Sequence, residues 1–188
     1  MEEKKILEYA KKHLSEKRFN HSLGVMERAG NLAKIYGEDI EKARKVGIAH
    51  DIAKELSKEE ILKYLKENNI KADEIELNNM GLLHGKIGAD MAKKIFNFSD
   101  DMCEAIKVHT TGKINMSLLD KILYISDKTE YGRKNVSYDI EYIKKLSNEN
   151  LDEAVIHMMD EGIKFNISKK DIIHPDSILA RNYLIINK

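Results

Sequence analysis

The sequence lacks several features that would place the protein in a specialised class. It has a single cysteine, Cys103, so no intrachain disulfide can form, which fits a reducing compartment. No run of apolar residues approaches the ~20 that a membrane-spanning helix needs. The N-terminal Met-Glu-Glu-Lys-Lys is unlike a secretory signal. We therefore expect a cytoplasmic protein that does not associate with membranes.

Proline, glycine and strand signals are also scarce. One proline and ten glycines stand among 188 residues rich in Lys, Glu, Ile and Leu, a composition that favours helices. There is no glycine-rich phosphate loop. Lys plus Arg and Asp plus Glu number 32 each, and this balance disfavours nucleic-acid binding. We predict an all-α protein that forms a single compact domain over residues 1–188 and does not bind nucleic acid.

Apolar residues at three- and four-residue spacing predict helices in most of the chain. The predicted helices cover residues 2–17, 21–36, 39–54, 83–96, 100–109, 150–165 and 176–186. Two more begin at capping residues: Ser57 with Glu60, and Ser117 with Asp120. Gly37 stands where the second helix is expected to end.

Polar residues interrupt three of these apolar stretches. His50 and Asp51 follow the apolar run 46–49, and Asp127 stands where its helix would be expected to continue with an apolar residue. His21 stands at the N-terminal end of the second predicted helix. Burying an ionised aspartate beside a histidine is costly unless a partner compensates.

A divalent metal ion is such a partner. Three helices can present these side chains to a single ion and leave positions open for water and substrate. The candidate ligands are His21, His50, Asp51 and Asp127. Imidazole and carboxylate donors suit zinc, manganese, iron or cobalt, and the thiolates of a structural zinc site are lacking.

The order of these residues, a histidine, a His-Asp pair and a distant aspartate, resembles the HD-domain metal-dependent phosphohydrolases. Further segments are similar to the YqeK family within that group, and together they extend over nearly the whole chain. They are residues 18–25, 50–54, 82–89, 105–112, 116–128, 174–176 and 180–182. Ser126 stands where alanine is expected, and residues 130–133 read Glu-Tyr-Gly-Arg where Glu-Pro-x-Arg is expected. Neither departure removes a candidate ligand.

The resemblance implies an HD-domain helical bundle with its C-terminal helices packed on it. Members of the family are known as symmetrical diadenosine tetraphosphate hydrolases with an iron-type metal centre, which cleave the phosphate bridge centrally to give two ADP. It therefore implies a divalent metal cofactor as one or two ions, iron with manganese or cobalt as alternatives. The ligand it implies is a dinucleoside polyphosphate or nucleotide. The resemblance also leaves room for a homodimer.

The resemblance also implies roles for individual residues. A bound metal would lower the pKa of a water molecule towards ~7, and Asp51 would ligate one ion or bridge two. Lys54 follows Asp51 by three residues, which predicts that both lie on one helix face. His84 and His109 remain open between two roles, as ligands of a second ion or as donors to the phosphates and the leaving oxygen. The candidates for phosphate binding are Arg18, Lys54, Thr110, Thr111 and Arg133.

Two alternatives stay open. The first is another HD-type nucleotide phosphohydrolase, such as a nucleotidase, a dNTP triphosphohydrolase or a cyclic-dinucleotide phosphodiesterase. The Gly-Tyr-Pro motif of the last group and the His-Asp-x-x-Glu-Asp pattern of alarmone hydrolases are missing. The second is a non-catalytic HD module that binds a nucleotide, and the presence of all four candidate metal ligands argues against it.

Overall fold

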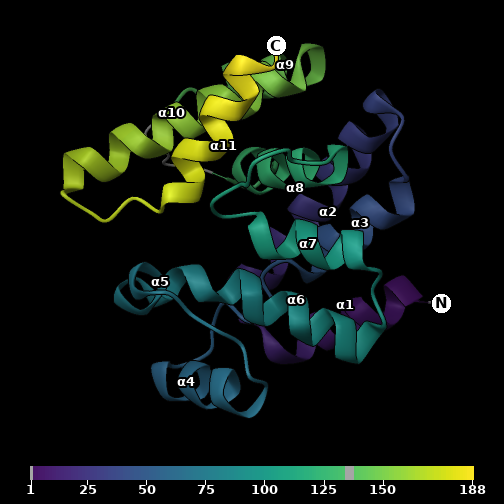
Figure 1. Ribbon diagram of the computed structural model, residues 1–188. Helices are drawn as coiled ribbons and strands as arrows, with labels where there is room; N and C mark the ends of the chain where they lie inside the picture. Colours follow the sequence, from purple (N-terminus) through teal and green to yellow (C-terminus); the bar gives the residue numbers. More distant parts are fainter. Residues whose placement is uncertain (1, 134–137) are drawn as a thin grey trace.

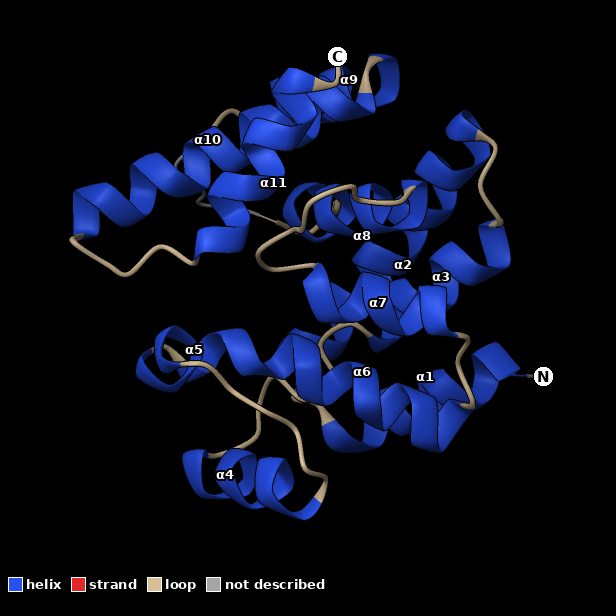
Figure 2. Cartoon of the chain, viewed as in Figure 1, coloured by secondary structure: helices blue, strands red, loops and turns tan. Residues whose placement is uncertain are grey.

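The computed structural model describes residues 2–133 and 138–188, and this part of the chain is helical with no strand (Figure 2). This confirms the predicted all-α class. None of the helices within these residues is long and apolar enough to cross a membrane. In chain order the helices are α1 (Glu2–His13), α2 (Glu16–Tyr36), α3 (Ile40–Ala49), α4 (Lys58–Glu67), α5 (Glu74–Asn78), the 3-10 helix η1 (Met80–Leu82), α6 (Leu83–Phe96), α7 (Asp100–Val108), α8 (Leu118–Thr129), α9 (Ile140–Glu149), α10 (Leu151–Lys169) and α11 (Pro175–Ile186).

The helices form a bundle whose centre is α2, α3, α7 and α8 (Figure 1). α2 packs along α3 and α8, and α7 packs against α6 and α8. α10 covers α8 and also contacts α9 and α11, so the C-terminal helices lie on one side of the bundle. α1, α4, α5 and α6 lie on the other side. All the helices that carry or precede the candidate metal ligands therefore meet in one place.

One large apolar core fills the bundle, and a small second core lies under α4. The largest fully buried side chains of the main core include Leu32, Ile48, Ile106, Ile122 and Leu123. The second core consists of Ala53, Ile61, Leu65, Leu83 and Ile87. Each large aliphatic side chain removed from water contributes about 1.5–3 kcal/mol to folding. This burial fixes the helices whose polar residues face one another.

Several helix ends lie where the sequence predicted them. Ser57 and Ser117 each accept a hydrogen bond from the backbone N–H three residues later, and the side chains of Glu60 and Asp120 accept one in return. Gly37 ends α2 with a φ of 75°, in the left-handed region that glycine adopts at little cost. These are local signals, and the structure confirms them.

The start of α2 differs from the prediction. The helix begins at Glu16 and not at residue 21, because the Ser15 side chain accepts a hydrogen bond from the N–H of Arg18. The carboxylate of Glu55 accepts from the backbone N–H and the hydroxyl of Ser15, at 2.7 and 2.6 Å, and holds this cap in place. His21 consequently lies in the second turn of α2 and not at its N-terminal end.

The end of α3 differs as well. The helix stops at Ala49, and residues 50–55 form turns. The N–H of Ile52 donates to Ala49 and that of Lys54 to Asp51, so each bond reaches back three residues and not four. The expectation that Asp51 and Lys54 share one face of a helix was therefore wrong. They lie in a turn that follows the helix.

Two α-helices and the 3-10 helix η1 were not predicted. α5 and α9 begin after Asp73 and Asp139, which cap them through their side chains. Two predicted lengths were also wrong, because α1 ends at His13, not at residue 17, and α10 runs to Lys169, not to residue 165. α9 buries Ile143 against the main core and so contributes to the side of the bundle where α10 lies.

Candidate metal centre

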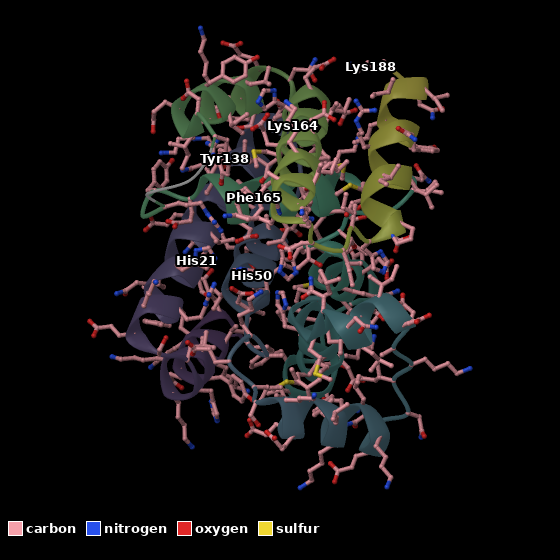
Figure 3. The ribbon with its side chains drawn as sticks, turned by 90° about the vertical axis from the view of Figure 1, so that its left-hand side faces the viewer. His21, His50, Tyr138, Lys164, Phe165 and Lys188 are labelled. Atoms are coloured by element: carbon pink, nitrogen blue, oxygen red, sulfur yellow. The ribbon has the colours of Figure 1, made fainter. Side chains whose placement is uncertain are left out.

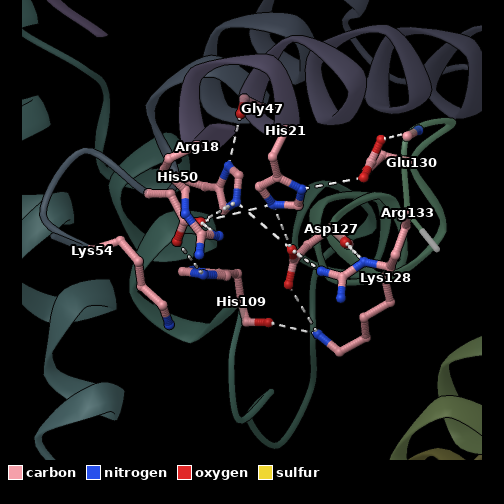
Figure 4. A network of polar contacts seen from close by, with 12 residues as sticks. Arg18, His21, Gly47, His50, Lys54, His109, Asp127, Lys128, Glu130 and Arg133 are labelled. Atoms are coloured by element: carbon pink, nitrogen blue, oxygen red, sulfur yellow. Dashed lines mark hydrogen bonds and ion pairs between the residues drawn. The ribbon is translucent and has the colours of Figure 1, made fainter. Parts of the chain in front are cut away.

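Four histidines and two aspartates that are far apart in the sequence meet inside the bundle. Figure 3 shows His21 and His50 within the molecule, and Figure 4 shows these two with His109 and Asp127 from close by. They are His21 on α2, His50 and Asp51 directly after α3, His84 on α6, His109 directly after α7, and Asp127 on α8. His21 and Asp127 are the most exposed of the six, and their side chains are still only 12% and 17% exposed. The structure thus brings together all four predicted metal ligands and the two histidines whose role stayed open.

Two glycines allow the helices that carry the histidines to approach closely. A Cβ atom on Gly47 would lie 2.7 Å from the Cα atom of Met26, so the backbones of α3 and α2 touch there. A Cβ atom on Gly85 would lie 2.7 Å from the carbonyl oxygen of Lys107, so α6 touches α7. Any larger residue at either position would force the two helices apart.

The histidines consequently form two pairs with crossed rings. In the first pair, His21 and His50, the ring centroids are 5.3 Å apart. In the second pair, His84 and His109, they are 4.8 Å apart. The rings of His50 and His109 are 5.1 Å apart and join the two pairs into one cluster.

The first pair faces two carboxylates. The Nε2 atom of His21 lies 3.1 Å from Oδ1 of Asp127, and that of His50 lies 3.3 Å from Oδ2 of Asp51. Both Nε2 atoms are buried, and neither makes a hydrogen bond of good geometry within the described residues. A buried polar atom without a hydrogen-bond partner lowers the stability of the fold unless another group, such as a metal ion, binds it.

The second pair faces the other oxygen of the same aspartate. Oδ1 of Asp51 lies 3.1 Å from Nε2 of His84 and 3.8 Å from Nε2 of His109. The two Nε2 atoms lie 3.0 Å from each other. Asp51 therefore stands between the pairs, with one carboxylate oxygen turned towards each.

The Nδ1 atoms determine which way these rings are protonated. In three of the histidines, Nδ1 lies within hydrogen-bond distance of the carbonyl oxygen of the residue three positions earlier. The distance is 2.8 Å for His50, 2.5 Å for His84 and 2.6 Å for His109. A carbonyl oxygen only accepts, so each Nδ1 carries a proton and donates it there, which leaves the Nε2 atom of each ring facing the cluster. The Nε2 atoms of His84 and His109 are close enough to face one cation together.

This donor set fits divalent metal ions. Ligand atoms of His21, His50 and Asp127 lie within 4.8 Å of one another, and so do those of His50, Asp51 and His109. The Nε2 atoms of His21 and His50 are buried without a hydrogen-bond partner among the described residues, and two carboxylates lie beside them. These residues include no thiolate. The set therefore matches a centre built from imidazole and carboxylate.

The electrostatics of the two aspartates agree with this. Burial opposes ionisation of Asp51, yet His50 and His84 overcome it and hold the pKa of that carboxyl well below its usual range. Burial likewise opposes ionisation of Asp127, and Lys128 and His21 hold its pKa well below the usual value. Both carboxylates are therefore ionised at neutral pH and concentrate negative charge where the histidines converge.

Glu130 belongs to the centre, and the sequence analysis missed it. Its Oε1 lies 3.4 Å from Nδ1 of His21, so this carboxylate orients the ring from behind. Burial disfavours the imidazolium form of His21, but Asp127 and Glu130 overcome this and raise its pKa to about 9. Gly24 has no side chain to block Glu130, and the N–H of Gly132 donates to the same carboxylate.

Lys128 is a second residue that the sequence analysis missed. Its Nζ atom lies 3.6 Å from Oδ2 of Asp127 and 3.6 Å from the centre of the Tyr124 ring. It also donates to the carbonyl oxygen of His109 at 3.2 Å. Burial lowers the pKa of Lys128 to about 8, against the pull of Asp127. The only feature of the sequence that could have identified Lys128 is its position directly after the candidate ligand Asp127.

Three of the predicted phosphate-binding residues surround the cluster. Nη1 of Arg18 donates to Oδ2 of Asp51 at 2.7 Å, and Nζ of Lys54 lies 3.3 Å from a ring nitrogen of His84. The third is Arg133 (Figure 4).

Arg133 contacts the helix that carries Asp127. Its Nη2 donates to Oδ1 of Asp127 at 3.0 Å, and its Nε donates to the carbonyl oxygen of the same residue at 2.9 Å. Its ion pair in this structure is with Asp127.

The two threonines are placed differently. Thr110 lines a large cavity next to α10 and also a small cavity of about 80 Å³. Thr111 lines only the small cavity, whose described lining includes none of the six central side chains, and its hydroxyl donates to the carbonyl oxygen of Gly112 at 3.0 Å. The structure therefore brings Thr110, but not Thr111, to a cavity that reaches the centre.

Two large cavities adjoin the centre. The first, here called the α10 cavity, has a volume of about 500 Å³. Its lining includes Tyr124, Asp127, Lys128, Arg133, Tyr138, Met158, Met159 and Phe165. The second, here called the α2 cavity, has a volume of about 590 Å³. It is lined by Lys17, Arg18, Asn20, His21, Glu130, Gly132 and Arg133.

A separate group of possible ligands lies at the surface. Asp73, Glu76 and His174 place ligand atoms within 4.8 Å of one another. Lys86 already pairs with Glu76 at 2.6 Å, and His174 pairs with Asp73 at 3.2 Å. The ion pair between His174 and Asp73 connects the start of α5 with the start of α11. The two ion pairs already compensate the charges of the two carboxylates.

Comparison with known proteins agrees with this geometry. The HD domain model matches residues 18–132, which include every residue of the cluster. A protein of Halalkalibacterium halodurans named "Bis(5'-nucleosyl)-tetraphosphatase, symmetrical" is 35% identical over 185 residues, 98% of this chain and 97% of the relative. A protein of Bacillus subtilis with the same name is 32% identical and covers 98% of each chain.

A solved structure is similar over the same length. A predicted HD superfamily hydrolase from Clostridium acetobutylicum, described as involved in NAD metabolism, superimposes with a TM-score of 0.93. The two chains are 43% identical, and the match covers 98% of this chain and 97% of the other. Fold and sequence therefore agree over the full length, including the C-terminal helices.

Proposed function

This chain belongs to the YqeK family of HD-domain proteins, and from that premise we propose that it is a metal-dependent hydrolase that cleaves diadenosine tetraphosphate symmetrically into two ADP. The observation that carries the proposal is the position of Asp51, whose two carboxylate oxygens face two different histidine pairs. A carboxylate so placed suits a centre that acts on a phosphoanhydride bond.

Within this proposal the centre has two ion sites that share Asp51. His21, His50 and Asp127 complete the first site with Oδ2 of Asp51. His84 and His109 complete the second with Oδ1 of Asp51. Divalent ions held there would polarise phosphoryl oxygens and would lower the pKa of water towards neutral pH. Imidazole and carboxylate donors suit iron, with manganese and cobalt as alternatives.

The ligand role for His109 is better supported than the role of proton donor. Burial, followed by the neighbouring His84, lowers the pKa of His109 well below its usual value, so the ring is neutral. Its one proton is on Nδ1, which donates to the carbonyl oxygen of Ile106. His109 therefore has a lone pair to offer and no proton to give on the side that faces the cluster. Nδ1 of His84 likewise donates to a carbonyl oxygen, that of Gly81, and leaves Nε2 facing the cluster.

The cationic side chains around the cluster hold the phosphate chain. Arg18, Lys54, Lys128 and Arg133 all lie beside Asp51, Asp127 or a histidine of the cluster. Their charges offset those of the phosphates and position the reacting phosphorus atom in front of the centre. These electrostatic interactions stabilise the transition state most strongly where water is excluded. No covalent intermediate is required, in agreement with the lack of a nucleophile among these residues.

The α10 cavity takes one adenosine of the substrate. It starts at Asp127 and Lys128 and continues past the rings of Tyr124, Tyr138 and Phe165. Aromatic side chains next to an ammonium group suit a base and the phosphates that follow it. We extend this proposal to residues 1–188 as one HD domain whose C-terminal helices pack on it, since α10 provides part of the cavity.

Product analysis tests the proposed function. The protein is first treated with a chelator, then loaded separately with Fe(II), Mn(II) or Co(II) and incubated with diadenosine tetraphosphate before the nucleotides are separated. We expect no turnover before loading and ADP as the nucleotide product afterwards. AMP together with ATP would contradict central cleavage. No product with any of the three metals would contradict the hydrolase itself and favour a module that only binds nucleotides.

A further inference from the structure

The two cavities beside the centre adjoin each other at Arg133 and at the contact between His21 and Asp127. Arg133 lines both of them, Asp127 lines the α10 cavity and His21 lines the α2 cavity. His21 and Asp127 contact each other at 3.1 Å. An extended ligand that occupies both cavities would therefore lie across Arg133 and the pair of His21 and Asp127, with one half on each side.

The linings of the two cavities differ in chemistry. The α10 cavity offers aromatic rings and thioethers, and Figure 3 shows Tyr138 and Phe165 on the side of His21 and His50 where α10 lies. Phe165 is 46% exposed and has the ammonium group of Lys169 5.8 Å from its ring centre, so its ring is accessible to a base and the phosphates next to it. This cavity suits a nucleoside.

The α2 cavity offers mainly charge. Lys17, Arg18 and Arg133 provide cations, and its one carboxylate, Glu130, is engaged by His21 and by the N–H of Gly132. Within the described part of the chain, its lining contains no Phe, Tyr, Trp or aliphatic residue, and its one ring is that of His21, which the proposed function assigns to the metal. It suits phosphates and leaves a base without a stacking partner.

From this asymmetry we infer that the protein grips only one nucleoside of its substrate, and that it also hydrolyses nucleoside 5'-tetraphosphates. The inference rests on the proposed function. The second half of the ligand is held in the α2 cavity through its phosphates, so the nucleoside at that end is dispensable. Mixed dinucleoside tetraphosphates that contain one adenosine are substrates for the same reason.

The additional reaction has a simple balance. Adenosine 5'-tetraphosphate and one water molecule give ADP and pyrophosphate. The phosphoanhydride bond between the second and third phosphorus atoms breaks, and the water oxygen bonds to one of these atoms while the bridging oxygen leaves on the other. The protons of the water go to the leaving oxygen and to solvent. The same bond position is cleaved as in diadenosine tetraphosphate.

A series of three substrates tests the inference. Diadenosine tetraphosphate, adenosine 5'-tetraphosphate and inorganic tetraphosphate carry two, one and no nucleosides. Stacking a base on an aromatic ring is worth roughly 5- to 150-fold in affinity. We therefore expect kcat/KM to change by less than about fivefold when the first nucleoside is removed, and to fall by more than about tenfold when the second is removed.

Other outcomes of this series are decisive as well. A large fall at the first step would show that both nucleosides are gripped and would overturn the inference while the proposed function stands. A series without a fall at either step would overturn it too, because no nucleoside would then be gripped. Failure to cleave diadenosine tetraphosphate would instead overturn the proposed function.

Two variants locate the halves of the substrate. Phe165→Ala should lower kcat/KM for the two adenosine-containing substrates by the same factor and leave inorganic tetraphosphate unchanged. Lys17→Met should raise KM more for adenosine 5'-tetraphosphate, whose terminal phosphate carries extra charge, than for diadenosine tetraphosphate. Lys34→Met is the matched control, because Lys34 is exposed on the same helix and lines neither cavity. Equal effects of Lys17→Met and Lys34→Met would contradict a phosphate role for the α2 cavity.

Discussion

The first and second histidine pairs are built in the same way but differ in charge. Each comes from two helices that touch at a glycine. The first pair faces Asp127 and one oxygen of Asp51, whereas the second faces only the other oxygen of Asp51 and has the ammonium group of Lys54 beside it. Similar packing therefore need not give similar sites. Cationic side chains lie beside both pairs, because Arg18 and Arg133 contact the carboxylates of the first pair as Lys54 contacts the second. The first pair has two carboxylates as further ligands and the second has one, so we expect the first ion to bind more tightly than the second.

Asp51→Asn should have the largest effect, because it removes the one carboxylate that the two pairs share. Loss of a residue that only orients a metal ligand typically costs 10–100-fold. We expect hydrolysis of diadenosine tetraphosphate to fall by more than about 100-fold, since a ligand itself is lost. Metal content should fall as well, which elemental analysis measures. Asp101→Asn is the control, because Asp101 pairs with Lys42 at the surface. If Asp51→Asn kept both metal and activity, the shared position of Asp51 would have no functional meaning.

His21→Asn and His84→Asn separate the two pairs. His21→Asn should lose the tightly bound ion and lower activity on the order of 100-fold, while His84→Asn should lose only the weaker ion and lower it on the order of tenfold. Metal content after extensive dialysis distinguishes the two variants. The exposed His13, replaced in the same way, provides the control. Identical metal loss in the two variants would mean that the pairs hold a single ion.

Glu130→Gln tests the carboxylate behind the first pair. The replacement keeps the shape of the side chain and removes the charge that orients His21. We expect the affinity for the first ion to fall roughly tenfold and that for the second to stay unchanged, as measured by competition with a chromophoric chelator. Glu104→Gln, which changes a carboxylate paired with Lys107 on α7, serves for comparison. An equal loss at the two sites would contradict a role confined to His21.

Gly47→Ala and Gly85→Ala should have the smallest effect on chemistry and a clear effect on stability. Each added methyl group would meet backbone atoms at 2.7 Å and push two helices apart. We expect each variant to lose about 1–3 kcal/mol in free energy of unfolding by urea. Gly162→Ala on α10 should instead gain up to about 1 kcal/mol, because the position is open. Wild-type stability of both Gly47→Ala and Gly85→Ala would contradict the close helix contacts.

Much of this architecture was predictable, because its signals are local. Ser57 and Ser117 predict helix starts because each forms a capping box with an acidic residue three positions later. Gly37 predicts a helix end. The order His21, His50, Asp51 and Asp127 identified the side chains that the structure brings together. Ser15 before α2 and Asp139 before α9 were signals of the same kind that the sequence analysis did not use.

The remainder depends on contacts between distant segments. Gly47 reads as a weak helix residue until Met26 is known to lie against it. Glu130 reads as the end of a helix, and its role appears only when His21, 109 residues earlier in the chain, lies beside it. The division between an aromatic cavity and a charged cavity is likewise a property of packing and is invisible to periodicity.

A manganese titration followed by electron paramagnetic resonance tests the central claim most directly. The chelator-treated protein takes up Mn(II) in steps while the signal is recorded. Two ions that share Asp51 should bind one after the other, the first giving an isolated Mn(II) signal and the second converting it into a spin-coupled one, as expected for ions about 3.5–4 Å apart. A single ion per chain at saturation, with a signal that stays uncoupled, would contradict the shared centre.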